Sequence, residues 1–219
     1  MEFPDLKFAV RSEPLVLFWP AKNTPLAQLQ FDTIENWHSF VDAMSLNPLV
    51  PDVVRLKFQR ALKLYYLAWI DGDLIKAGEL VALTALELAL NDRYGRQVPG
   101  RPRKKLKPGQ APGLGDAPPQ RSFAALLKHM VDGDGLTDTE IPMIVRCGGT
   151  AVGQLIGTTK PTLADRRNAL AHGDPFDGLP TSGLIELVRD LIEFAYRGHI
   201  EEAQAQVIVI NDTLPSVSR

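Results

Sequence analysis

The sequence is poor in the residues that build disulfides and metal sites. Cys147 is its only cysteine, so an internal disulfide is excluded, and no Cys/His cluster has the spacing of metal ligands. The glycines Gly148, Gly149, Gly153 and Gly157 match neither a P-loop nor a dinucleotide fingerprint, because no Lys-Ser/Thr pair or following acidic residue accompanies them. We therefore expect neither a metal nor another cofactor.

Long apolar runs are also missing. No stretch reaches the roughly 20 apolar residues that span a bilayer. The first residues, Met-Glu-Phe-Pro-Asp, lack the basic start and apolar core of a signal peptide. These absences lead us to expect a soluble cytoplasmic protein with no membrane partner. The hydrophobic fraction of 45% still suffices for a sizeable core.

Excess charge is small overall but unevenly distributed. The net charge is −2, whereas residues 96–121 carry +6 and the rest of the chain −8. The same segment is rich in proline and glycine and has no aromatic residue, so we predict a long loop without base stacking. Its central basic residues are candidates for binding an RNA backbone: Arg101, Arg103, Lys104, Lys105 and Lys107. The alternative is a solvated connector.

Apolar residues recur every three or four positions through most of the chain, which indicates amphipathic helices. The segment from Leu74 to Tyr94 is the most apolar, and Gly95 is placed to end it. Ser122 and Ser182 read as N-caps of two later helices. Helices are expected at 33–44, 51–71, 74–94, 123–131, 162–172 and 182–196. Together they predict a mainly α fold, an up-and-down helical bundle.

Both ends of the chain contain runs typical of β-strands. Leu6–Val10 and Leu15–Trp19 could pair as a hairpin, and Ala205–Ile210 is a β-branched run near the other end. A small sheet joining the termini is therefore expected as an appendage. The predicted organisation is an N-terminal segment at 1–32, a helical domain at 33–197 and a C-terminal tail at 198–219. Within the helical domain, the basic loop occupies 96–120 and an irregular insertion with room for one short helix occupies 133–159.

The helix expected at 162–172 has a signal at each end. Thr162 can be its N-cap, with the hydroxyl accepting a bond from the amide of Asp165. Asp165 also suits the positive end of the helix dipole. Gly173 follows the last residue and can adopt the left-handed conformation that ends a helix.

Three polar residues of this helix stand out. On a helical wheel Arg167 falls within an apolar face formed by Leu163, Leu170 and two alanines, and Asn168 and His172 lie at its edge. A buried arginine is costly unless it is paired.

Glu87, within the most apolar helix, is the obvious candidate partner of Arg167. Two interpretations follow: a structural Arg167 paired with Glu87, or a functional guanidinium beside an amide and an imidazole.

The sequence Arg-Asn-Ala-Leu-Ala-His-Gly at 167–173 resembles the signature of HEPN domains, the nucleotide-binding helical bundles of higher eukaryotes and prokaryotes. That signature is an Arg, usually with a polar neighbour, followed at short distance by a His, here Arg167, Asn168 and His172. The order of helices over roughly 50–197 is similar as well. The basic loop, the insertion and the N-terminal segment fall outside the common pattern.

This resemblance implies a homodimer with a composite site and, in active members, metal-independent RNA cleavage. Arg167, Asn168 and His172 would be the catalytic residues, with Glu87 in a structural or supporting role. It also implies a toxin or phage-defence effector, with an antitoxin or a nucleotidyltransferase as a partner protein. The alternative is a non-catalytic HEPN-like bundle that binds RNA, a nucleotide or a protein.

Overall fold

Helices make up most of the molecule. The computed structural model describes residues 3–6, 9–100, 121–173 and 180–213, without the side chains of Pro25 and 206–213. Its elements are β1 (Leu15–Ala21), β2 (Thr24–Phe31), α1 (Ile34–Asp42), α2 (Asp52–Leu67), α3 (Leu74–Tyr94), α4 (Phe123–Asp132), the short 3-10 helix η1 (Asp138–Glu140), α5 (Pro142–Cys147), α6 (Val152–Ile156), α7 (Leu163–His172) and α8 (Leu184–Thr213). The mainly helical class predicted from sequence is confirmed.

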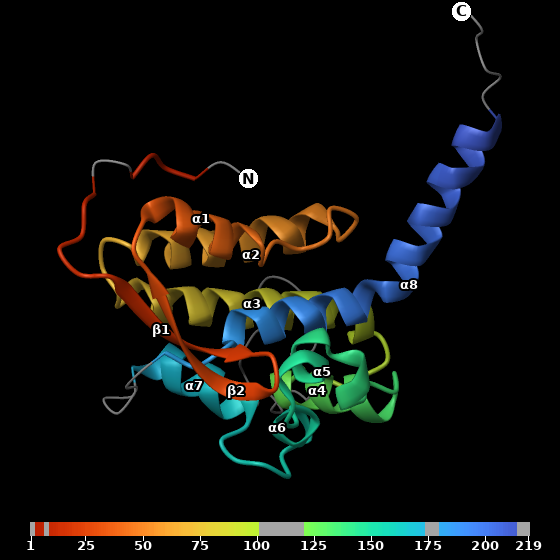
Figure 1. Cartoon of the computed structure of the whole chain (residues 1–219). Coiled ribbons are helices and arrows are strands. Elements are labelled where there is room, and N and C mark those ends of the chain that lie inside the picture. Colours follow the sequence, from red (N-terminus) through yellow and green to blue (C-terminus); the bar gives the residue numbers. More distant parts are fainter. Residues whose placement is uncertain (1–2, 7–8, 101–120, 174–179, 214–219) are drawn as a thin grey trace, which may run out of the picture.

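The helix α3 is the centre of the fold. It contacts α2, α8, α4 and α7, which surround it in Figure 1. Leu83, Leu86 and Leu90 are fully buried, as expected for a helix that is apolar on all sides. Gly78 lets α2 approach closely, since a Cβ there would lie 2.6 Å from the ring of Tyr65.

The sheet is an N-terminal hairpin. β1 pairs antiparallel with β2, Leu15 lies opposite Phe31, and Asn23 takes a positive φ of 59° in the connecting turn. The predicted pairing of Leu15–Trp19 with Leu6–Val10 is wrong, because Leu6, Ala9 and Val10 are not in a strand. The partner was hard to recognise because β2 contains Pro25, a residue that argues against a strand.

The predicted strand at 205–210 is also wrong. α8 continues through this segment to Thr213 and, in Figure 1, extends beyond the other helices. β-branched residues favour strands only weakly. A helix that has already formed gains one hydrogen bond for each residue added, and Glu, Ala and Gln at 201–206 are good helix formers. No sheet joins the two ends of the described chain.

The insertion at 133–159 is more regular than predicted. It contains η1, α5 and α6. Oδ1 of Asp138 accepts hydrogen bonds from the amides of Ala151 and Val152 at 2.7 and 3.0 Å, which fixes the start of α6. Among the described residues, no helix has both the length and the apolar character needed to cross a membrane.

Candidate functional site

The helix α7 begins and ends as predicted. Oγ1 of Thr162 accepts a hydrogen bond from N of Asp165 at 2.9 Å, and Oδ2 of Asp165 accepts one from N of Thr162 at 3.0 Å. This capping box satisfies two amides at the start of the helix. Gly173 has φ 69° and ψ 56°, the left-handed conformation that ends it.

Asp165, the single acid of this helix, has a perturbed pKa. Nζ of Lys160 lies 2.9 Å from its Oδ2. The hydrogen bonds from Lys160, and then those from the backbone and hydroxyl of Thr162, lower the pKa of Asp165 from 3.8 to about 2. The carboxylate therefore stays charged well below neutral pH, at the end of α7 where the helix dipole favours a negative charge.

Arg167 forms the ion pair that the sequence suggested. Its Nη2 lies 2.8 Å from Oε2 of Glu87 on α3, with 28% of the Arg167 side chain and 19% of the Glu87 side chain exposed. Its Nη1 donates to Oδ1 of Asn168 at 3.2 Å. Its Nε is buried and has no hydrogen-bond partner among the described residues. The pair ties α7 to α3 and orients the guanidinium at the protein surface.

The apolar face predicted around Arg167 is narrower than expected. Of its residues Leu163 is buried, Leu170 is half-buried and Ala171 is exposed. α7 is a surface helix that covers α3 with one side, and Leu163 is its single fully buried residue. Of the apolar face predicted around Arg167, Leu163, Ala164 and Leu170 pack against the core and Ala171 does not.

Asn168 and His172 are exposed side chains of the same helix. They are four residues apart, which makes them neighbours on the helix surface. The structure thus brings Arg167, Asn168 and Glu87 into contact and leaves the imidazole of His172 accessible at the last residue of α7. This arrangement offers a phosphate a fixed guanidinium, with a proton carrier one helical turn from Asn168.

The other predicted site residues cannot be placed. Arg101, Arg103, Lys104, Lys105 and Lys107 all lie outside the described residues. Within the described ranges, no group of three or more His, Cys, Asp or Glu residues could hold a metal ion.

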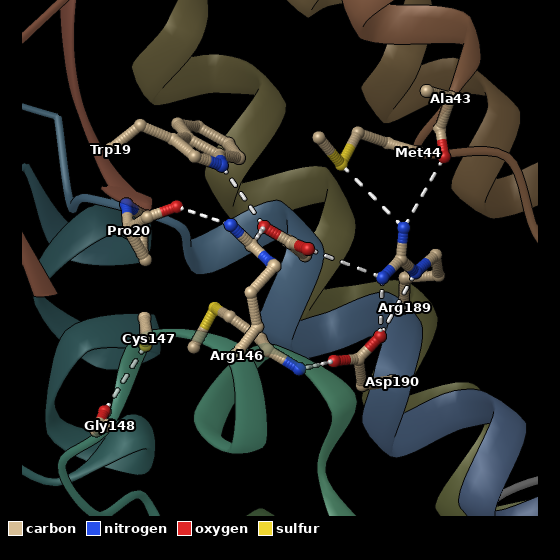
Figure 2. Close-up of polar contacts among 11 residues, drawn as sticks. Trp19, Pro20, Ala43, Met44, Arg146, Cys147, Gly148, Arg189 and Asp190 are labelled. Atoms are coloured by element: carbon tan, nitrogen blue, oxygen red, sulfur yellow. Dashed lines mark hydrogen bonds and ion pairs between the residues drawn. The ribbon is translucent and has the colours of Figure 1, made fainter. Parts of the chain in front are cut away.

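Sequence reasoning missed a charged network between the hairpin and α8. Oε2 of Glu186 accepts hydrogen bonds from Nε1 of Trp19 at 3.0 Å and from Nη2 of Arg146 at 2.6 Å. Nη1 of Arg146 donates to O of Pro20 at 2.7 Å, and Figure 2 shows Trp19, Pro20 and Arg146 converging here. The residues come from β1, α5 and α8, so no local sequence pattern could reveal the network.

The same network continues along α8. Asp190, which is 4% exposed, accepts a hydrogen bond from Nη2 of Arg189 at 2.7 Å, as Figure 2 shows. It also accepts one from N of Met143 at 2.8 Å. Burial raises the pKa of Asp190, which the charge of Arg189 only partly offsets. The bonds of Glu186 to Trp19 and Arg146 and of Asp190 to Met143 join α8 to β1 and α5, so this network is a structural clamp.

No protein-family model, curated protein or solved structure matches this chain. Its function has to be inferred from its own residues.

Proposed function

We propose that this protein is a metal-independent endoribonuclease of the HEPN type, with Arg167, Asn168 and His172 as its catalytic residues. The observation that carries the proposal is the arrangement of the polar side chains on α7. Glu87 holds the guanidinium of Arg167 in contact with Asn168, while His172 is exposed on the same short helix. The exposed amide and imidazole are the groups that a phosphate-cleaving site would need beside this arginine.

The reaction needs two proton carriers. The 2′-hydroxyl of a ribose loses its proton and attacks the adjacent phosphorus, and the bond from phosphorus to the 5′-oxygen breaks. The leaving oxygen takes up a proton, which gives a 2′,3′-cyclic phosphate and a 5′-hydroxyl. One His172 supplies one carrier, so a homodimer would supply the base and the acid across its two-fold axis. Arg167 would stabilise the charge that develops on the phosphate.

The test is cleavage of single-stranded RNA in EDTA by the wild type and by the His172→Ala and Arg167→Ala variants. We expect each substitution to reduce the rate about a hundredfold or more, because proton transfer and charge stabilisation each contribute on that order. His199→Ala, which alters an exposed histidine of α8, and Arg60→Ala, which alters an exposed arginine of α2, are the matched controls. Cleavage that survives both α7 substitutions would overturn the assignment.

One observation favours a second candidate, a non-catalytic HEPN-like bundle that binds RNA, a nucleotide or a protein. Nη1 and Nη2 of Arg167 already have protein partners. In this case Arg167→Ala should unfold the protein at lower urea concentration while His172→Ala binds RNA as the wild type does. A matched Glu87→Gln variant would show the same loss of stability. An RNA-cleaving wild type would exclude this candidate.

RNA binding by the basic loop is a separate part of the proposal. Replacing Arg103, Lys104 and Lys105 by Gln should reduce the slope of log affinity against log salt by about 2, since each lost phosphate contact removes about 0.7 for a single strand. Lys63, Arg60 and Lys57 of α2, changed together to Gln, provide a control of equal charge. An unchanged slope in the loop variant would mean that the loop is a connector. A toxin or phage-defence effector would in addition arrest growth until an antitoxin partner is supplied.

A further inference from the structure

A cavity of about 520 Å³ lies where the hairpin, α5, α6, α7 and the start of α8 meet. Its size is within the range of small-molecule sites. Its lining includes the apolar residues Phe18, Leu26, Met143 and Leu187 and the polar residues Arg166 and Ser182. Among the described residues that line the cavity, Arg166 is the single charged one.

The guanidinium of Arg166 has little compensation from the protein. Its Nη1 donates to Oγ1 of Thr181 at 3.0 Å, and no carboxylate of the described residues lies within ion-pair distance of it. Oε1 of Glu79 accepts a hydrogen bond from N of Thr181 at 2.5 Å, and Glu79 is not among the lining residues. A half-buried guanidinium with one hydroxyl partner favours an anion beside it.

Two buried donors in the lining lack acceptors. Nε of Arg166 and Oγ of Ser182 are both buried, and neither has a hydrogen-bond partner among the described residues. The prediction that Ser182 is the N-cap of the last helix is wrong for this reason: α8 begins at Leu184 and the hydroxyl caps nothing. Unpaired buried donors are costly. Both atoms are covered, so a rotation of the Arg166 or Ser182 side chain toward the cavity would bring its donor to an oxygen acceptor there.

The remaining wall is apolar. Met143 and Leu187 are buried beneath it, whereas Phe18 and Leu26 are 48% and 59% exposed. Exposed apolar residues beside a cavity are typical of a site that an apolar ligand covers. The positive charge and the unpaired donors therefore share the cavity with an apolar surface.

We propose that this cavity binds a small molecule that has an anionic head, a carboxylate or a phosphate, on an apolar body. Arg166 and Ser182 bind the head through hydrogen bonds, and Phe18 and Leu26 cover the body. Arg166 lines this cavity, and the proposed nuclease residue Arg167 does not. The proposal does not depend on RNA cleavage.

Calorimetric titration of the full chain with four eight-carbon probes tests the proposal. Octanoate and octyl phosphate carry the two anionic heads, 1-octanol has a neutral head and octylamine a positive one. We expect both anions to bind at least tenfold more tightly than 1-octanol, and octylamine not to bind, because a charged hydrogen-bonded head adds about one decade or more of affinity. The tighter of the two anions identifies the head. Equal binding of octanoate and octylamine, or no binding of either anion, would overturn the proposal.

Variants locate the binding. Arg166→Gln removes the charge, and Gln154→Glu adds a negative charge to the lining with little change of shape. Each should weaken octanoate binding by about tenfold or more. Arg60→Gln on α2 is the matched control and should bind as the wild type does. Arg166→Gln also removes the hydrogen bond from Arg166 to Thr181 and can therefore lower the stability of the protein. Gln154→Glu keeps that bond, so it tests the binding site in a folded protein. Unchanged affinity in Gln154→Glu would show that the ligand binds elsewhere.

Discussion

Asp165 makes the stability of α7 depend on pH. Its pKa is lowered from 3.8 to about 2 by Lys160 first and then by Thr162, so the folded state holds the charged carboxylate more strongly than the unfolded state does. The resulting stability is fully present above pH 3.8 and is lost as the pH falls through 2. Acid should therefore weaken the start of the helix that carries the proposed catalytic residues.

Asp165→Asn tests this linkage. We expect the difference in unfolding free energy between wild type and variant to be constant from pH 7 to about 5 and to shrink steadily below about 4. Urea unfolding followed by circular dichroism at each pH measures it. Lys160→Met removes the largest cause of the lowered pKa of Asp165. In that background, the effect of Asp165→Asn on the unfolding free energy should depend less on pH. A difference that does not change with pH would contradict the role of Asp165.

For individual residues, the sequence predicted a contact correctly where helix-end geometry or the cost of burying a charge determines that contact. The N-cap Thr162 and the end residue Gly173 follow from backbone geometry within one turn. Glu87 was predictable as the partner of Arg167, because an acid in an apolar helix and an arginine near an apolar face each need a counter-charge. The exposure of Ala171 was not, since it depends on which neighbours cover α7.

Among the elements, the start of α8 is constrained by two glycine-specific features. Gly183 has φ +71°, and a Cβ there would lie 2.5 Å from Cγ of Pro20 in β1. We expect Gly183→Ala to lower the unfolding free energy by about 1 kcal/mol or more, because neither the conformation nor the space suits an alanine. Urea unfolding measures the change.

The same helix offers the control. Gly198 lies inside α8, and a Cβ there would meet nothing within 4 Å. Gly198→Ala should raise stability by about 0.5 to 1 kcal/mol, since glycine is unfavourable in a helix interior. Opposite signs at Gly183 and Gly198 would confirm that the start of α8 requires a glycine. A neutral Gly183→Ala would mean that β1 can move away from α8.

The elements also mark where sequence reasoning ends. α3 was predicted at Leu74–Tyr94 because this is the most apolar segment of the chain and Gly95 follows it. β2 was missed because its alternation is weak around Pro25, and its pairing with β1 is what holds it. The end of α8 was read as a strand because local propensity was weighed without the preceding helix, whose propagation decides the conformation.

On the scale of the whole molecule, the hairpin must be fastened to the helical body. The inner side of β1 contributes Leu15, Leu17 and Trp19 to the core, where each is less than a tenth exposed. Glu186 then fixes Trp19 and Arg146 through a single carboxylate oxygen. Apolar burial supplies the attraction, and this polar clamp fixes where along α8 the hairpin lies.

Removing Arg146 should loosen this attachment without unfolding α3. Arg146→Ala loses the bond to O of Pro20 and leaves Glu186, which is 6% exposed, with Trp19 and a longer 3.4 Å contact to Arg189. We expect the unfolding free energy to fall by about 1 to 3 kcal/mol, the cost of an under-satisfied buried carboxylate.

Hydrogen exchange separates a local loosening from a global one. In Arg146→Ala the amides of Leu15–Ala21 should exchange through a partial opening, faster than those of Leu74–Tyr94, which report global unfolding. Arg60→Ala is the control for the loss of an arginine elsewhere. Equal acceleration of β1 and α3 would mean that the hairpin and the helices open as one unit. Faster exchange in β1 alone would mean that the hairpin, which carries Phe18 and Leu26, moves relative to the helices. Because these two residues form one wall of the cavity, octanoate binding should weaken in Arg146→Ala as well.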